Sequence, residues 1–83
     1  MNTIKHDLNE LLKGLLKKGL LKQEDIKEED GGAVLIELKD GLSVAIYEAG
    51  YSLRFNNNYR MRTFNDRATM LINLEHLIQL EHK

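Results

Sequence analysis

The feature that most constrains this chain is an alternation of apolar with polar or small residues from Ala33 to Thr63. A period of two is the pattern of a β-strand that buries one of its faces. The alternation is interrupted three times, and each interruption consists of residues that favour turns. The sequence therefore predicts four short strands joined by tight turns. The turns are expected at Lys39-Asp40-Gly41, Ala49-Gly50 and Asn56-Asn57-Asn58.

The apolar positions also predict how these strands pair, because a slip of one residue would turn the apolar side chains of a strand outward. Leu38 is expected opposite Leu42, which leaves a three-residue loop with Gly41 in the left-handed conformation. The same pattern pairs Ile46 with Leu53, Val44 with Phe55, Phe55 with Tyr59 and Leu53 with Met61, with Asn58 as the left-handed residue of the last turn.

Helical periodicity flanks the predicted sheet. A stripe of leucines and one isoleucine predicts a first helix over residues 3–18, ended by Gly19. Residues 20–32 are expected to form an acidic loop or one short helical turn. A second helix is predicted over residues 64–80, with a start that resembles a capping box at Thr63 to Asp66. The stripe of the first helix is Ile4, Leu8, Leu11, Leu12, Leu15 and Leu16; the inner face of the second is Phe64, Ala68, Leu71, Leu74, Leu77 and Ile78, widened by Met70.

Together these elements predict an α+β fold in the order α-β-β-β-β-α, as a single domain over residues 1–83. The sheet, residues 33–63, is expected to be a four-stranded antiparallel meander, with the N-terminal and C-terminal helices covering the same face. At 83 residues the core is small, so self-association into a homodimer would add stability.

The charges are unevenly distributed. The formal net charge of −1 argues against a protein that binds nucleic acid through bulk positive charge. Residues 1–22 carry five lysines against two acids, residues 23–50 carry eight acids against two lysines, and residues 51–67 carry four arginines against one acid. All five aromatic residues lie between Tyr47 and Phe64. The sequence thus predicts a local surface that is basic and aromatic.

Several classes of function are not indicated. There is no cysteine, which excludes a disulfide, a thiolate nucleophile and a cysteine-ligated zinc site. No apolar run approaches the ~20 residues that cross a bilayer, and no signal-peptide pattern is present. We therefore expect no membrane partner, no cofactor and a cytoplasmic location.

Catalytic motifs are also missing from the sequence. It contains no phosphate-binding glycine loop, no Gly-x-Ser-x-Gly and no His-Glu-x-x-His. His76 and His82 are six residues apart and lie on different sides of a helix, whereas a shared metal favours a spacing of four. We therefore expect no catalytic residue, no metal site and no enzymatic activity.

The polar side of the predicted sheet carries a cluster of arginines. The predicted register places Arg54 directly opposite Arg60, and the neighbouring row brings Tyr47 and Arg62 to either side of Ser52. Two arginines that face each other repel and destabilise a sheet, and an anionic partner would relieve the repulsion. Alternatively, both side chains extend into water, or a nearby acidic residue neutralises them.

These observations favour a small non-enzymatic binding or regulatory module that contacts a protein partner through Arg54, Arg60, Arg62 and Tyr47. The alternative is a domain that binds single-stranded nucleic acid with the same residues, because the β-β-β-β-α order resembles that of some sheet domains that bind single strands. The small size and the absence of enzyme motifs also suit a phage or mobile-element inhibitor of a host protein.

Overall fold

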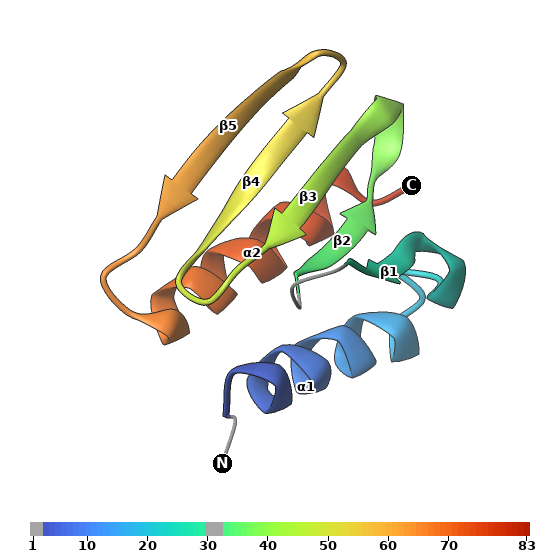
Figure 1. Ribbon diagram of the computed structural model, residues 1–83. Helices are drawn as coiled ribbons and strands as arrows, with labels where there is room; N and C mark the ends of the chain where they lie inside the picture. The colour runs from blue at the N-terminus through green and yellow to red at the C-terminus, as the bar shows by residue number, and fades with distance from the viewer. Residues whose placement is uncertain (1–2, 30–32) are drawn as a thin grey trace.

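A computed structural model describes residues 3–29 and 33–83, with side chains from residue 7 onward within those ranges. Two helices flank five antiparallel strands (Figure 1), so the predicted α+β class is confirmed and the predicted number of four strands is wrong. In chain order the elements are α1 (Thr3–Lys17), η1 (Gln23–Asp25), β1 (Ile26–Glu28), β2 (Val34–Glu37), η2 (Lys39–Gly41), β3 (Leu42–Ile46), β4 (Gly50–Phe55), β5 (Asn58–Thr63) and α2 (Arg67–Glu81). The strands lie in the order β1-β2-β3-β4-β5 across one sheet.

Helix α1 buries one stripe and ends at a glycine, as its sequence predicts. The side chain of Ile4 lies outside the described residues. Gly19 has a φ of 80°, a left-handed conformation that glycine adopts without steric cost. The N–H of Leu20 donates to the carbonyl of Leu15 at 3.0 Å, which satisfies one of the last carbonyls of the helix. The buried residues of the stripe are Leu8, Leu12 and Leu15.

Strand β1 is the strand that the sequence does not predict. The segment 20–32 contains one helical turn, η1, but Ile26 to Glu28 then pair with β2. Only Ile26 of this strand packs against the core, so there is no alternation for a pattern to detect. An ion pair of 3.1 Å between Lys27 Nζ and Glu37 Oε1 joins β1 to the end of β2. Residues 30–32 of the predicted loop lie outside the described residues.

The hairpin of β2 and β3 has the predicted register. Val34 pairs with Ile46, and Ile36 pairs with Val44. All four side chains are buried, so a slip of one residue would turn the apolar side chains of one strand away from the core. Gly41 has a φ of 77°, the left-handed conformation that the sequence predicts for the loop.

Strand β4 is displaced by two residues along β3 relative to the prediction. Ile46 pairs with Tyr51 rather than with Leu53, and Val44 pairs with Leu53. Successive side chains of a strand point to opposite faces, so a displacement of two residues leaves every side chain of β4 on its predicted face. Tyr51 is therefore buried against the helices, at 2% exposure.

The turn between β3 and β4 explains this displacement. It consists of Glu48 and Ala49 rather than Ala49 and Gly50, and the N–H of Tyr47 donates to the carbonyl of Gly50 at 2.9 Å. Gly50 belongs to the strand, where β5 passes so closely that an added Cβ would lie 2.5 Å from the carbonyl oxygen of Arg62. The absence of a side chain is needed for this close approach of two strands.

Strand β5 is displaced by one residue, and this displacement reverses the faces of its side chains. Tyr59 pairs with Arg54 rather than with Phe55. The turn before β5 has two residues, and its left-handed residue is Asn56, with a φ of 56°, rather than Asn58. All six residues of β5 are exposed, so burial selects neither face and the turn sets the register.

Helix α2 begins at Arg67, three residues later than predicted. Asp66 is the N-cap, and its Oδ1 accepts a hydrogen bond of 2.7 Å from the N–H of Thr69. Thr63 cannot serve as the cap because it is still part of β5. The helix contributes Met70, Leu74 and Ile78 to the core, each with 0% exposure.

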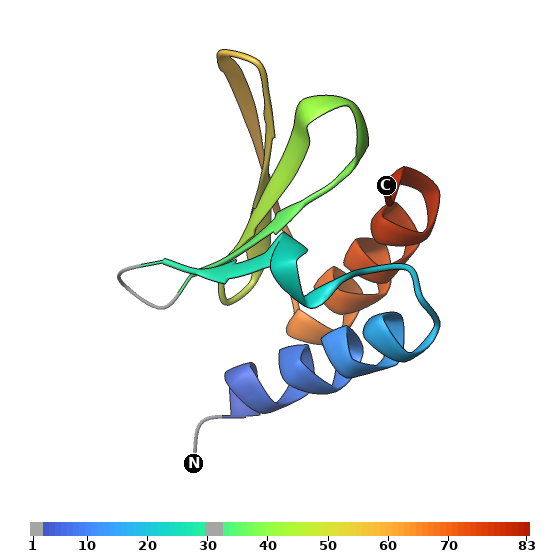
Figure 2. The ribbon, with the colours of Figure 1, turned by 90° about the vertical axis from the view of Figure 1, so that its right-hand side faces the viewer.

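Both helices lie on the same side of the sheet (Figure 2), as predicted. The core fills the space between them and the inward residues of β2, β3 and β4. The end of the β4–β5 hairpin extends beyond α2. Phe55, at that end, points toward the helix side of the sheet and is nevertheless 47% exposed. Among the described residues, no helix covers the other face of the sheet (Figure 2).

Candidate functional site

We call the sheet face that points away from the helices the open face. Its side chains alternate along each strand with those that enter the core. The strand registers arrange them in rows across the sheet, and the central rows run through β3 and β4. These rows are Lys27, Leu35, Ala45, Ser52 and Met61; Glu37, Ser43, Arg54 and Tyr59; and Glu29, Ala33, Tyr47, Gly50 and Thr63.

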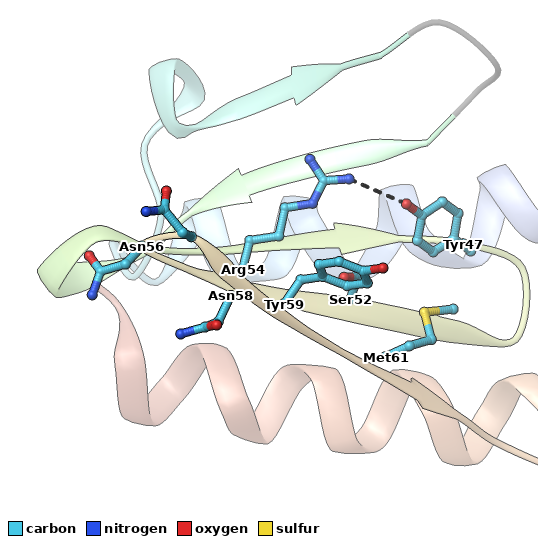
Figure 3. Close-up of a pocket in the computed structure, with 8 residues that line it drawn as sticks. Tyr47, Ser52, Arg54, Asn56, Asn58, Tyr59 and Met61 are labelled. Atoms are coloured by element: carbon cyan, nitrogen blue, oxygen red, sulfur yellow. Dashed lines mark hydrogen bonds between the residues drawn. The ribbon is translucent and has the colours of Figure 1, made fainter.

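The centre of the open face is a floor of small residues under larger neighbours. Ala45 is 0% exposed and Ser52 is 5% exposed, although no described helix covers them. Tyr47 and Arg54 come from the rows on either side, and Arg54 Nη2 donates to the Tyr47 hydroxyl at 3.5 Å (Figure 3). The two side chains therefore reach across the row of Ala45 and Ser52 and shield it from water.

Arg54 is held loosely in this arrangement. Its Nη1 lies 3.8 Å from Oε1 of Glu29, and its side chain is 43% exposed. An exposed ion pair of this length contributes little to stability, and the 3.5 Å contact with Tyr47 is long for a hydrogen bond. The guanidinium group of Arg54 thus keeps donors that a carboxylate of a partner could engage in a forked pair.

A hollow of about 480 Å³ opens beside this bridge, between the small floor and the β4–β5 turn (Figure 3). The large side chains around it are well exposed: Tyr59 at 78%, Met61 at 48% and Tyr47 at 39%. Tyrosine, methionine and arginine are enriched in protein–protein interfaces. The lining residues are Tyr47, Ser52, Arg54, Asn56, Asn57, Asn58, Tyr59 and Met61.

The charges of the open face are balanced. Lys27 and Arg54 are matched by Glu29 and Glu37, and the two contacts between them are 3.1 Å for Lys27 with Glu37 and 3.8 Å for Arg54 with Glu29. The ammonium group of Lys27 donates to Glu37 and holds the pKa of that carboxyl below its ordinary value. The open face therefore does not have the excess of positive charge that a groove for a nucleic acid backbone requires.

The four predicted site residues do not form one cluster. Arg54 and Tyr47 share the open face, whereas Arg60 and Arg62 lie on the helix side of β5, because that strand is displaced by one residue. The guanidinium carbon of Arg62 lies 5.3 Å from the ring centroid of Phe64, a cation–π contact. The predicted repulsion between Arg54 and Arg60 is therefore wrong, since the two side chains are on opposite faces.

The fourth arginine of the chain, Arg67, stabilises a turn. Its Nη1 donates to the carbonyl of Tyr47 at 3.3 Å and also to the carbonyl of Glu48. Burial lowers the pKa of Arg67, and the charges of Asp7 and Glu48 oppose that effect. Arg67 therefore holds the β3–β4 turn against the start of α2 and belongs to the fold rather than to the open face.

Two residues of the site were not predicted from the sequence. The predicted pairing of Tyr59 with Phe55 and of Met61 with Leu53 places both on the core side of the sheet, whereas the displaced register brings both to the open face. The sequence feature that could have located them is the turn: a two-residue hairpin turn with Asn56 in the left-handed conformation is as compatible with the run of asparagines as a three-residue turn.

The described residues contain no group of three histidine, cysteine, aspartate or glutamate side chains placed to hold a metal ion. Within the same residues, neither helix is long and apolar enough to cross a membrane. Comparisons with protein-family models, curated proteins and solved structures find no match to this chain.

Proposed function

We propose that the chain is a non-enzymatic binding module that contacts a protein partner through its open face. The observation that carries the proposal is the combination of Tyr47, Tyr59 and Met61, all substantially exposed, with a loosely held Arg54 around a floor of small residues. Aromatic and arginine side chains of this kind supply most of the binding energy in protein interfaces. The hollow between them would accept an apolar side chain of the partner.

Single-stranded nucleic acid is the weaker candidate partner. The two tyrosines could stack on bases, but the displaced register moves Arg60 and Arg62 to the other face. The open face is left with two cations that are matched by two carboxylates. Phosphate neutralisation supplies most of the affinity of such complexes, and a balanced surface does not provide it.

Further details of the function stay predictions. A cytoplasmic location, a homodimer and a role as a phage or mobile-element inhibitor of a host protein are compatible with a small binding module.

The proposal is tested by comparing partner capture by three forms of the full chain. The open-face variant carries Tyr47→Ser and Met61→Ser. The control variant carries Ile72→Ser and Leu80→Ser, which change two exposed apolar residues of α2 at 67% and 60% exposure. We expect one protein from extracts of the native host to be retained by the wild-type chain and the control variant. The open-face variant should lose at least about tenfold in affinity for that protein, or about 1.4 kcal/mol.

Two results would contradict the proposal. One is a captured protein that binds all three forms equally, because its contact would lie elsewhere. The other is a labelled oligonucleotide that binds the wild-type chain more tightly than any protein, with an affinity that falls steeply between low and physiological salt. Circular dichroism of each variant establishes that loss of binding does not reflect loss of folding.

A further inference from the structure

Strand β5 forms one edge of the sheet and has a free hydrogen-bonding side. It pairs with β4 on one side, and no strand of the described residues lies beyond it. The N–H of Phe64 donates to the carbonyl of Ala49. This bond shows which residue pairs of the β4–β5 hairpin are the hydrogen-bonded ones. Because hydrogen-bonded and non-hydrogen-bonded pairs alternate in an antiparallel ladder, Tyr59, Met61 and Thr63 direct their backbone groups away from β4.

This edge has few of the features that usually prevent pairing with another chain. Folded proteins protect edge strands by making them short, by proline, by bulges or by covering them. Strand β5 has six residues and pairs with β4 without a bulge, and the chain has no proline. Within residues 3–29 and 33–83, the only protective feature is a pair of charged residues, Arg60 and Arg62, that alternate along the helix side of the strand.

The two arginines argue against a second copy of the chain as the occupant of this edge. If β5 paired antiparallel with β5 of a second copy about a two-fold axis, the helix-side faces of both strands would lie on the same side of the joined sheet. The registers that pair most of the strand then place Arg60 opposite Arg60 of the copy, or Arg60 opposite Arg62 of the copy. Like charges directly opposite each other destabilise a sheet, so the pair disfavours self-association through β5.

The same arginines favour an acidic strand. Arg62 contacts the Phe64 ring, and neither Arg60 nor Arg62 has a carboxylate partner within 4 Å among the described residues. Carboxylates at alternate positions of an added strand would lie opposite both guanidinium groups and could form forked pairs. The intervening side chains of that strand would lie beside Tyr59 and Met61 on the open face, which favours apolar residues there.

We infer that β5 is a strand-addition site for an extended segment of a partner protein in which acidic and apolar residues alternate. The main chain of that segment would hydrogen-bond to Tyr59, Met61 and Thr63, and its carboxylates would pair with Arg60 and Arg62. This mode of recognition takes affinity from backbone hydrogen bonds and specificity from alternate side chains. The inference rests on the edge of β5 and on the arginines of its helix side, and it shares only Tyr59 and Met61 with the open-face proposal, so different variants test the two.

The test uses capped seven-residue peptides with the full chain. The probe alternates glutamate with valine; a second peptide replaces glutamate with lysine; a third is the probe with N-methyl groups on the amides that would face β5. We expect the probe to bind and to slow amide hydrogen exchange at Tyr59, Met61 and Thr63. The lysine peptide and the N-methylated peptide should each bind at least about tenfold more weakly.

A charge-reversal variant, Arg60→Glu with Arg62→Glu, completes the test. Both residues are exposed, so the variant should fold, and it should bind the lysine peptide in preference to the probe. The inference is overturned if the probe does not bind at millimolar concentration, if the N-methylated peptide binds as well as the probe, or if charge reversal leaves the preference unchanged. Dimerisation of the wild-type chain through β5 in sedimentation experiments would also overturn it. A Tyr47→Ser variant, which changes an open-face residue outside β5, should keep its affinity for the probe, which separates this result from the test of the open face.

Discussion

The register of β5 decides which side chains form the candidate site, and a pair of engineered cysteines tests it directly. Ser52 and Met61 lie opposite each other on the open face in a non-hydrogen-bonded pair, a position whose short Cα separation suits a disulfide. The double variant Ser52→Cys with Met61→Cys should therefore form a bridge under mild oxidation. Because the chain has no cysteine of its own, every bridge observed is the engineered one.

The expected stabilisation follows from the size of the loop that the bridge closes. About ten residues lie within it, for which the loss of chain entropy in the unfolded state corresponds to about 2.5 kcal/mol. For a domain of this size, 1 kcal/mol shifts the melting temperature by roughly 4–8 °C, so oxidation should raise it by about 10–20 °C. Strain in the bridge would reduce this value, and the direction of the change is the essential result.

The matched control is Ser52→Cys with Arg62→Cys. In the register predicted from the apolar pattern, Ser52 would face Arg62, whereas the structure places those side chains on opposite faces. Thiol titration and non-reducing mass spectrometry measure the bridge, and thermal melts with and without reductant measure its effect. If the control variant oxidises faster than the test variant and gains the larger stabilisation, the structural register and the site built on it are wrong.

Two further predictions concern stability. Asp66→Ala removes the acceptor for the N–H and the hydroxyl of Thr69, at 2.7 Å and 3.0 Å, and should lower the free energy of unfolding by about 1 kcal/mol, measured by urea denaturation; Asp66→Asn should recover most of the loss, and equal losses in both variants would count against capping as the cause. The hydrogen bond from Lys83 lowers the pKa of Asp25, so this carboxylate stabilises the fold fully above its ordinary pKa of about 4 and loses that effect as pH falls through the lower folded value. Asp25→Asn should therefore lower the melting temperature at pH 7 and have a progressively smaller effect below about pH 4, and a pH-independent difference would refute this linkage.

The parts of the fold that the sequence predicts correctly are those where burial acts on both partners. Val34 and Ile36 face Ile46 and Val44, and all four are buried, so only one register of β2 and β3 is compatible with a closed core. The end of α1 is also predicted correctly. The residue that caps this helix adopts the left-handed conformation, which glycine takes at little cost, and Gly19 stands at that position.

The errors occur where burial gives no information. A displacement of β4 by two residues preserves every face, so the apolar pattern cannot detect it. The close approach of β5 to Gly50 is a backbone contact, which the pattern of side chains does not reveal either. Both faces of β5 are exposed, and there the apolar character of Tyr59 and Met61 led to the wrong face. Strand β1 escaped prediction because Ile26 is its only apolar residue.

The site was predicted in part for the same reasons. Tyr47 and Arg54 are correctly placed because they depend on the faces of β3 and β4, which the displacement by two preserves. Arg60 and Arg62 are misplaced because they depend on β5. The protein-binding proposal therefore rests on tyrosine and methionine side chains more than on arginine.

The free end of the β4–β5 hairpin, which extends past α2, has a consequence for how such a chain can change over generations. Side chains at that end contribute little to the packed interior, since Phe55 is 47% exposed and all six residues of β5 are exposed. If this surface binds a partner as we propose, substitutions there would alter which molecules are recognised while leaving folding nearly intact. A lineage that must follow a rapidly varying partner could therefore diversify this tip freely, whereas the leucine-rich interior would stay under tight constraint.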